Sequence, residues 1–142
     1  MKRAILIVLL CLFGRTFSFC QCAVAVCYET GAWGVGFQGR YFEPLKSEEY
    51  YRKAALDECK SKGGTDCKVL GYNNLPGLYM FISGKSRSGK IVFAISSAKK
   101  DYDEARNDVV VMFETLSEHN SADHFKWYYW RVPSDAGVQV VP

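Results

Sequence analysis

The chain has 142 residues, of which 49% are hydrophobic and 23% charged, with 18 basic and 15 acidic side chains. This length supports one hydrophobic core, and the apolar content excludes an intrinsically disordered protein. Three of the basic residues, Lys2, Arg3 and Arg15, lie near the start of the chain. Without them, 15 basic residues balance 15 acidic ones, and this balance argues against a nucleic-acid partner.

Residues 1–20 predict a secretory signal peptide. A basic start is followed by an apolar run over residues 4–14 and by small side chains at Ser18 and Cys20. The run is too short to span a bilayer, so it is typical of a cleaved signal. We expect the mature chain to begin at Gln21, to be periplasmic or secreted, and to form a single domain over residues 21–142 without inserting into a membrane.

Two alternatives to this maturation remain open. Thr16 and Ser18 would also permit cleavage before Phe19, and a cysteine near the site invites lipidation. A lipidated cysteine normally follows Gly or Ala, whereas Phe19 precedes Cys20 and Gln21 precedes Cys22. We therefore expect no lipid, which the intact mass of the exported protein would verify.

The first half of the mature chain predicts a hairpin, a helix and two further strands. Residues 22–28 and 33–37 are β-branched or aromatic runs separated by a turn composition. From Ser47 to Ser61, Tyr51, Ala55 and Cys59 fall four apart, as on one face of a helix. Ser47 is suited to the N-cap, and Gly63-Gly64 to the stop. Strand character returns over residues 67–72 and 78–83.

The second half repeats this order at a separation of about 55 to 58 residues. Residues 90–96 predict a strand, and residues 124–132 predict another. Between them, Asp101 caps a helix with Glu104 three residues on. Its apolar positions follow helical spacing and predict the buried face: Ala105, Val109, Met112, Phe113 and Leu116.

These elements predict an α+β fold. Two strand–helix–strand pseudo-repeats would share one mainly antiparallel sheet, with both helices on one face. The pseudo-repeat is one of pattern, because residue identity between the halves is poor.

Part of the first half resembles the family of exported bacterial domains called domain of unknown function 4189. The resemblance covers Ala23 to Gly71. Its motifs are a Thr-Gly-aromatic-Gly turn at Thr30–Gly34, an Ala-Leu-x-x-Cys helix ending at Cys59, and a second cysteine, Cys67, opening a strand. The chain departs from the family after Tyr72, where a further cysteine is missing, and the second helix has none. The resemblance implies a fold and no catalytic residues.

Four cysteines remain after removal of the signal peptide, an even number typical of disulfides in an oxidising compartment. Cys59 and Cys67 are joined by a short path through Gly63-Gly64, so we expect them to be bonded. Cys22 and Cys27 lie about 16 Å apart along one strand and point to opposite faces. They can bond only across a bulge or a strand end, and the alternative is that one or both stay as packed thiols.

Two glycine-rich segments imitate nucleotide-binding motifs. Residues 34–39 have dinucleotide-binding spacing, but no helix follows them, so their glycines are interpreted as small residues that allow close packing. Residues 84–90 have phosphate-loop spacing, but Ile91 replaces the hydroxyl and a strand follows. We therefore expect a basic hairpin tip there and no cofactor.

No catalytic or metal-binding constellation is evident in the sequence. His119 and His124 lie in a polar loop and lack a third ligand at suitable spacing. The acidic clusters at Glu48-Glu49 and residues 101–104 begin helices, where they favour the helix dipole. We expect a protein without enzymatic activity.

The remaining functional signal is a surface. In the aromatic strand, Trp127 and Tyr129 alternate with Tyr128 and Trp130, so one of these two sets is expected to face outward. The outward set, or the basic tip formed by Lys85, Arg87 and Lys90, would bind a partner. The favoured function is an exported protein-binding module such as an inhibitor or immunity factor. The alternative is a carbohydrate or cell-wall binder that stacks sugars on these aromatic rings.

Overall fold

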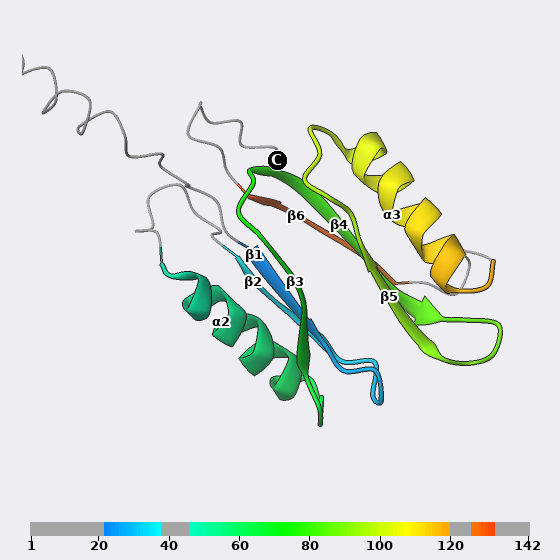
Figure 1. The fold of residues 1–142 in the computed structure, drawn as a ribbon, viewed down its shortest axis with the longest axis horizontal. Coiled ribbons are helices and arrows are strands. Elements are labelled where there is room, and N and C mark those ends of the chain that lie inside the picture. The colour runs from blue at the N-terminus through cyan, green and yellow to red at the C-terminus, as the bar shows by residue number, and fades with distance from the viewer. Residues whose placement is uncertain (1–21, 38–45, 120–125, 133–142) are drawn as a thin grey trace, which may run out of the picture.

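The computed structural model describes residues 22–37, 46–119 and 126–132. These residues form four layers, with one helix on each outer side and two β-sheets between them (Figure 1). In chain order the elements are β1 (Cys22–Val26), β2 (Trp33–Phe37), α2 (Glu48–Ser61), β3 (Lys68–Asn73), β4 (Gly77–Lys85), β5 (Ile91–Ile95), α3 (Tyr102–Leu116) and β6 (Lys126–Val132). Neither described helix is long and apolar enough to cross a membrane.

The two halves of the chain have the same topology. In the first unit, residues 22–73, β1 and β2 form a hairpin, α2 follows, and β3 pairs antiparallel with the other side of β1. In the second unit, residues 77–132, β4 and β5 form the hairpin, α3 follows, and β6 pairs antiparallel with β4. The strand orders β2-β1-β3 and β5-β4-β6 are therefore equivalent.

The predicted α+β class is confirmed, and so is the repeated order of strands and helices. The arrangement differs in one respect: the strands form two sheets, and each helix covers the outer face of its own sheet. The central strands explain this difference because they are apolar on both faces. In β4, Met80 and Ile82 face α3, whereas Tyr79 and Phe81 face the first sheet. A single sheet with both helices on one face would leave Tyr79 and Phe81 in water.

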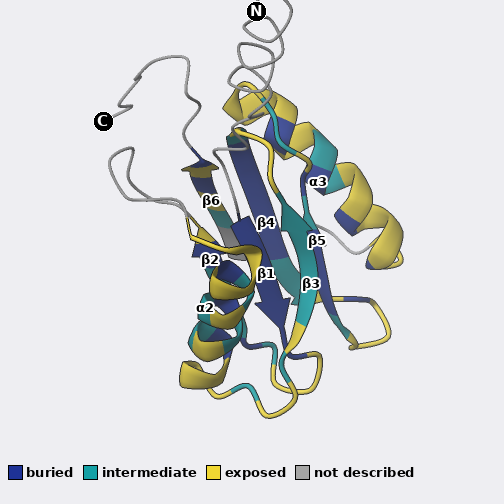
Figure 2. Ribbon diagram, turned by 60° about the vertical axis from the view of Figure 1, so that its left-hand side comes forward, coloured by how far each residue is buried: buried dark blue, intermediate teal, exposed yellow. Residues whose placement is uncertain are grey.

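An aromatic core joins the two sheets. The ring centroid of Trp33 in β2 lies 4.8 Å from that of Phe81 and 4.2 Å from that of Tyr128. Tyr79 stacks on Trp130, with 10° between the ring planes. Such pairs contribute about 0.5–1.5 kcal/mol each beyond their buried area. The central strands, β1 and most of β4, are consequently buried, as their dark colour in Figure 2 shows.

Helix α2 packs directly on β2 because two glycines remove the side chains between them. A Cβ atom on Gly34 would lie 2.3 Å from the carbonyl oxygen of Ala55, and one on Gly36 would lie 2.1 Å from that of Tyr51. Backbones at this distance leave no space for a larger residue. The interpretation of these glycines as close-packing residues is therefore confirmed.

Both helices begin at their predicted caps. The Ser47 side chain accepts a hydrogen bond from the Tyr50 N–H at 3.2 Å, and the Asp101 carboxylate accepts one from the Glu104 N–H at 2.9 Å. After α2, Gly63 has φ of +90°, which is accessible to glycine at little cost. Local sequence therefore fixes where these helices start and where α2 ends.

The close contact between α2 and β2 gives a direct test. Gly34→Ala should lower the free energy of unfolding by about 1–3 kcal/mol, because the added methyl group meets helix backbone that cannot give way. Gly71→Ala in β3 is the matched control, since a Cβ there has no heavy atom within 4 Å. The control should stay within about 0.5 kcal/mol of the wild type. Urea unfolding measures both, and equal stability of the two variants would contradict the packing described.

Candidate functional site

The two helices can be compared position by position, because their buried residues have the same spacing. Residue numbers differ by 54 between the buried residues Tyr51, Ala55 and Cys59 of α2 and the buried residues Ala105, Val109 and Phe113 of α3. The same offset aligns three outward residues of the first unit, Asp57, Glu58 and Lys62, with three of the second, Val111, Met112 and Leu116. The outer faces of equivalent helices therefore differ in chemistry.

Ion pairs cover the outer face of α2. Asp57 pairs with Lys53, and Glu58 pairs with Lys62 at 2.8 Å. Glu58 also accepts a hydrogen bond from the backbone N–H of Val35 in β2 at 2.6 Å. The Lys62 ammonium lies 4.1 Å from the centroid of the Trp33 ring. The outer surface of the first unit is thus polar, and three ion pairs join charged residues along it.

Aliphatic side chains occupy the corresponding positions of α3. Val111 is 66% exposed, Met112 41% and Leu116 51%. The prediction that Met112 and Leu116 belong to the buried face is therefore wrong. They lie outside the face of the helix that packs on the sheet of the second unit, where Ala105, Val109 and Phe113 are buried. We call Val111, Met112 and Leu116 the α3 ridge.

A shallow groove of about 810 Å³ runs along the ridge. Its lining residues are Lys99, Glu104, Asn107, Asp108, Val111, Met112, Thr115 and Leu116. The residues beneath the helix account for the space. The helix-facing positions of β5 are Val92 and Ala94, where β2 has Gly34 and Gly36, so α3 cannot approach its edge strand as closely as α2 approaches β2.

The surroundings of the ridge are acidic. Residues 101–118 contain six acidic side chains and one basic side chain, Arg106, whereas residues 47–62 contain four of each. At one end of the groove, Asp108 accepts hydrogen bonds from the N–H and hydroxyl of Ser97 and lies 3.6 Å from the Lys99 ammonium. An apolar ridge on a negatively charged helix is suited to a partner with apolar and basic groups.

The aromatic strand divides into buried and exposed residues, as its alternation predicts. Trp130 is 7% exposed and packs between the sheets, and Tyr128 is half-buried beside it. Tyr129 is 66% exposed, and its ring contacts that of Tyr102 edge to face, with centroids 5.8 Å apart. The expectation that the face away from the helix is exposed is wrong, because the other sheet covers it. The side chain of Trp127 lies outside the described residues.

The predicted basic tip is a hairpin between β4 and β5, and Lys85, Arg87 and Lys90 are exposed there. Arg87 is also a structural contact. Its guanidinium donates to the His119 carbonyl at 3.0 Å, and its N–H donates to that of Ser117 at 3.2 Å. These bonds hold the tip against the C-terminal end of α3. A binding role for the tip stays a prediction.

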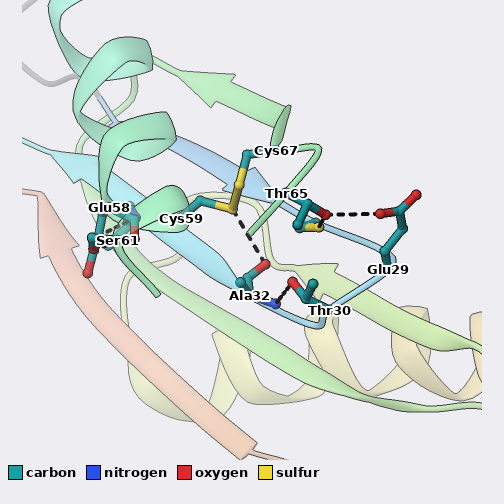
Figure 3. Close-up of a disulfide and its surroundings, with 10 residues drawn as sticks. Glu29, Thr30, Ala32, Glu58, Cys59, Ser61, Thr65 and Cys67 are labelled. Carbon is teal, nitrogen blue, oxygen red and sulfur yellow. Dashed lines mark hydrogen bonds between the residues drawn. A yellow bond between two sulfur atoms is a disulfide. The ribbon is translucent and has the colours of Figure 1, made fainter. Parts of the chain in front are cut away.

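The Cys59–Cys67 disulfide is present, with a Cα–Cα distance of 6.3 Å (Figure 3). It ties the end of α2 to the start of β3. Cys22 faces the core between the sheets and Cys27 faces α2, so the expectation that they point to opposite faces is confirmed, and neither belongs to a disulfide. Of the two alternatives that the sequence leaves open for these residues, the structure has the one in which they are packed without bonding to each other.

Hydrogen-bond donors surround the Cys27 sulfur. Bonds from the Thr30 side chain and the Asp66 N–H lower the pKa of Cys27 to about 6, against the effect of burial. The Thr65 hydroxyl lies 3.8 Å from this sulfur and donates to the Glu29 carboxylate at 2.9 Å. Sequence spacing did not predict this arrangement, because the donors come from the turn between β1 and β2 and from the loop between α2 and β3.

Metal-ligating side chains are dispersed over the described part of the chain. No three His, Cys, Asp or Glu side chains converge there in a metal-binding arrangement. His119 is exposed with φ of 57°, and His124 lies outside the described residues. The α3 ridge is the feature that helical periodicity missed. Its signal was the presence of more apolar residues than one buried stripe requires.

Disulfide removal should destabilise the fold. Closing a loop of about nine residues contributes roughly 2–3 kcal/mol on the chain-entropy model. Cys59→Ser and Cys67→Ser should each lower the free energy of unfolding by a similar amount, and the double variant should lose no more than either alone. Chemical denaturation measures all three. Additive losses in the double variant would show that the two sulfurs are not bonded.

The thiol of Cys27 predicts a pH-dependent stability. Its pKa is lowered in the folded state, so between about pH 6 and pH 9 the folded protein carries a thiolate that the unfolded chain protonates. The free energy of unfolding should rise with pH across this window. Below the window, the stabilisation that the thiolate provides should be absent. Cys27→Ala should remove this component. Equal pH dependence of both proteins in urea titrations would contradict the donor arrangement.

Comparisons with known proteins assign no family to the chain. No family model, curated protein or solved structure matches it. The resemblance of residues 23–71 to domain of unknown function 4189 therefore stays a prediction. Function must be inferred from the residues of the chain itself.

Proposed function

We propose that the mature chain is an exported protein-binding module without enzymatic activity, in the class of inhibitors and immunity factors, and that it binds its partner through the outer face of α3. The observation that carries this proposal is the α3 ridge. Aliphatic side chains stand there at positions where the equivalent helix has paired charges. The first unit of the same chain thus shows how the solvent-facing side of this helix looks when it carries charged residues, and α3 can be compared with it.

The energetics favour burial of this ridge. Fully burying one large aliphatic side chain contributes about 1.5–3 kcal/mol, and the three ridge residues are between two-fifths and two-thirds exposed. They occupy neighbouring turns, so one partner element can cover all three. In Figure 2 most of α3 has the colour of exposed residues. An apolar centre with a charged rim is the usual composition of a binding surface.

Export supports a stable module of this kind. The basic and apolar start of the chain predicts secretion, and the Cys59–Cys67 disulfide is suited to an oxidising compartment. A small domain with a cross-linked loop withstands such an environment well. These features match an inhibitor or immunity factor, for which binding is the entire activity.

Carbohydrate binding is the second candidate, and one observation favours it. Tyr102, at the start of α3, and Tyr129, in β6, are both exposed and contact each other. Exposed aromatic rings can stack on sugars. However, the two rings meet edge to face at 89°, which does not present a flat aromatic platform. Retention on purified peptidoglycan, reduced by Tyr129→Ala and unchanged by Val111→Lys, would favour this candidate over the first.

The proposed function predicts opposite behaviour of equivalent helix positions. Val111→Lys should weaken binding of a periplasmic protein partner at least tenfold, which is about 1.4 kcal/mol, because it places an ammonium in the apolar centre. Asp57→Lys introduces the same side chain at the equivalent position of α2 and should leave binding unchanged. Both residues are exposed, so neither variant should lose more than about 0.5 kcal/mol of stability.

Affinity for the partner captured by the mature protein can be measured by titration calorimetry. Equal binding by both variants would remove α3 from the interface. Failure of the wild-type protein to bind any exported protein specifically would contradict the proposed function itself.

A further inference from the structure

The edge strand β5 carries unpaired backbone groups, and Lys99, in the segment that follows this strand, lines the groove. In the hairpin, the Ser86 N–H bonds to the Lys90 carbonyl and the Ser96 N–H to the Met80 carbonyl, both at 2.8 Å. Because antiparallel pairs alternate, this register directs the N–H and C=O groups of Ile91, Phe93 and Ile95 away from β4. Strand β5 ends its sheet, and no described residue supplies a hydrogen bond to these groups.

We call the equivalent edge in the first unit closed, because the backbone N–H at its centre has a cap. The N–H of Val35, in β2, also points away from its hairpin partner, and the Glu58 carboxylate accepts its hydrogen bond at 2.6 Å. The residue of α3 that corresponds to Glu58 is Met112, which offers no such acceptor. An edge strand without a cap is a template for a further strand.

We infer that the open edge of β5 and the α3 groove together bind an extended, basic segment of the partner, which adds to the second sheet as a fourth strand. This inference rests on the proposed function and specifies the chemistry of its partner. The backbone of the segment pairs with Ile91, Phe93 and Ile95. Its alternate side chains point toward α3, where Met112 and the other groove residues receive them.

The negative charge of α3 determines which kind of segment can bind there. Residues 101–118 carry six acidic side chains and one basic, so lysine or arginine side chains of the segment gain favourable interactions along α3. A second copy of this chain, paired edge to edge through β5, would instead bring two acidic helices close together. Like charges disfavour that dimer. A partner segment that carries both apolar and basic residues on the face toward α3 therefore matches the ridge and its acidic rim.

The test uses the mature protein and a synthetic probe, the capped heptapeptide Lys-Thr-Val-Thr-Ile-Thr-Lys, whose alternate residues Lys, Val, Ile and Lys share one face of a strand. NMR titration should show its binding through the amide resonances of Ile91, Phe93 and Ile95. N-methylation of the alternate peptide amides that face β5 removes the pairing without changing charge, and it should weaken binding at least tenfold. Replacing the lysines with glutamates should abolish binding at the same concentrations.

Variants of the protein provide the matched controls. Met112→Glu installs the residue found at the equivalent position of α2 and should weaken peptide and partner binding at least tenfold. Met112→Leu preserves the apolar surface and should bind as the wild type does. Ser61→Glu makes the same charge change on α2 and should also bind normally, which separates a local block from a general change in charge.

The outcomes distinguish this inference from the proposed function. If the natural partner still binds in a manner sensitive to Val111→Lys, but N-methylation and Met112→Glu have no effect, the strand-addition mode is wrong and the binding surface stands. If neither peptide nor partner binds, both are wrong. A concentration-dependent dimer that Met112→Glu dissociates would assign the edge to a second copy and overturn the inference.

Discussion

The distance between each helix and its edge strand governs the rest of this structure. In the first unit that distance is short because Gly34 and Gly36 present bare backbone to α2. The approach brings Glu58 within hydrogen-bonding reach of the Val35 N–H. In the second unit, Val92 and Ala94 fill the corresponding positions and hold α3 away. One topology therefore yields a closed side and a side with a groove.

The core between the sheets tolerates this asymmetry because it is built from the other faces of the strands. Trp33, Phe81 and Tyr128 pack against one another there, regardless of how closely each helix sits on its outer face. The period of two along a strand separates these roles. The outer faces of the two units can therefore differ without changing the core between the sheets.

Much of the fold could be predicted from local patterns. Cap residues such as Ser47 and Asp101, the glycine stop after α2 and the spacing of Cys59 and Cys67 each specify local structure, and the structure confirms them. The division into two sheets could not be predicted in this way, because pairing between distant strands leaves no local signal. Apolar residues on both faces of β4 were the available indication that a second layer covers it.

The candidate site was less predictable, for a related physical reason. A methionine or leucine at helical spacing is compatible with either a buried or an exposed stripe, so Met112 and Leu116 were assigned to the core. Only their exposed fractions, compared with the charged residues of α2, identify a surface. Conversely, Trp130 is a residue typical of interfaces, but it lies in the core. Residue types indicate which side chains could contribute to a binding surface. The packing of the two sheets determines which of these side chains are exposed to solvent.

The central claim is that one edge of a duplicated unit is closed and the other is open. Amide hydrogen exchange in the mature protein tests it most directly. The Val35 amide should exchange slowly and lose that protection in Glu58→Gln more than neighbouring amides do, since the neutral side chain is a weaker acceptor. The Phe93 amide should exchange much faster than Val35 and become protected in Met112→Glu. Comparable protection of Val35 and Phe93 in the wild-type protein would contradict the account.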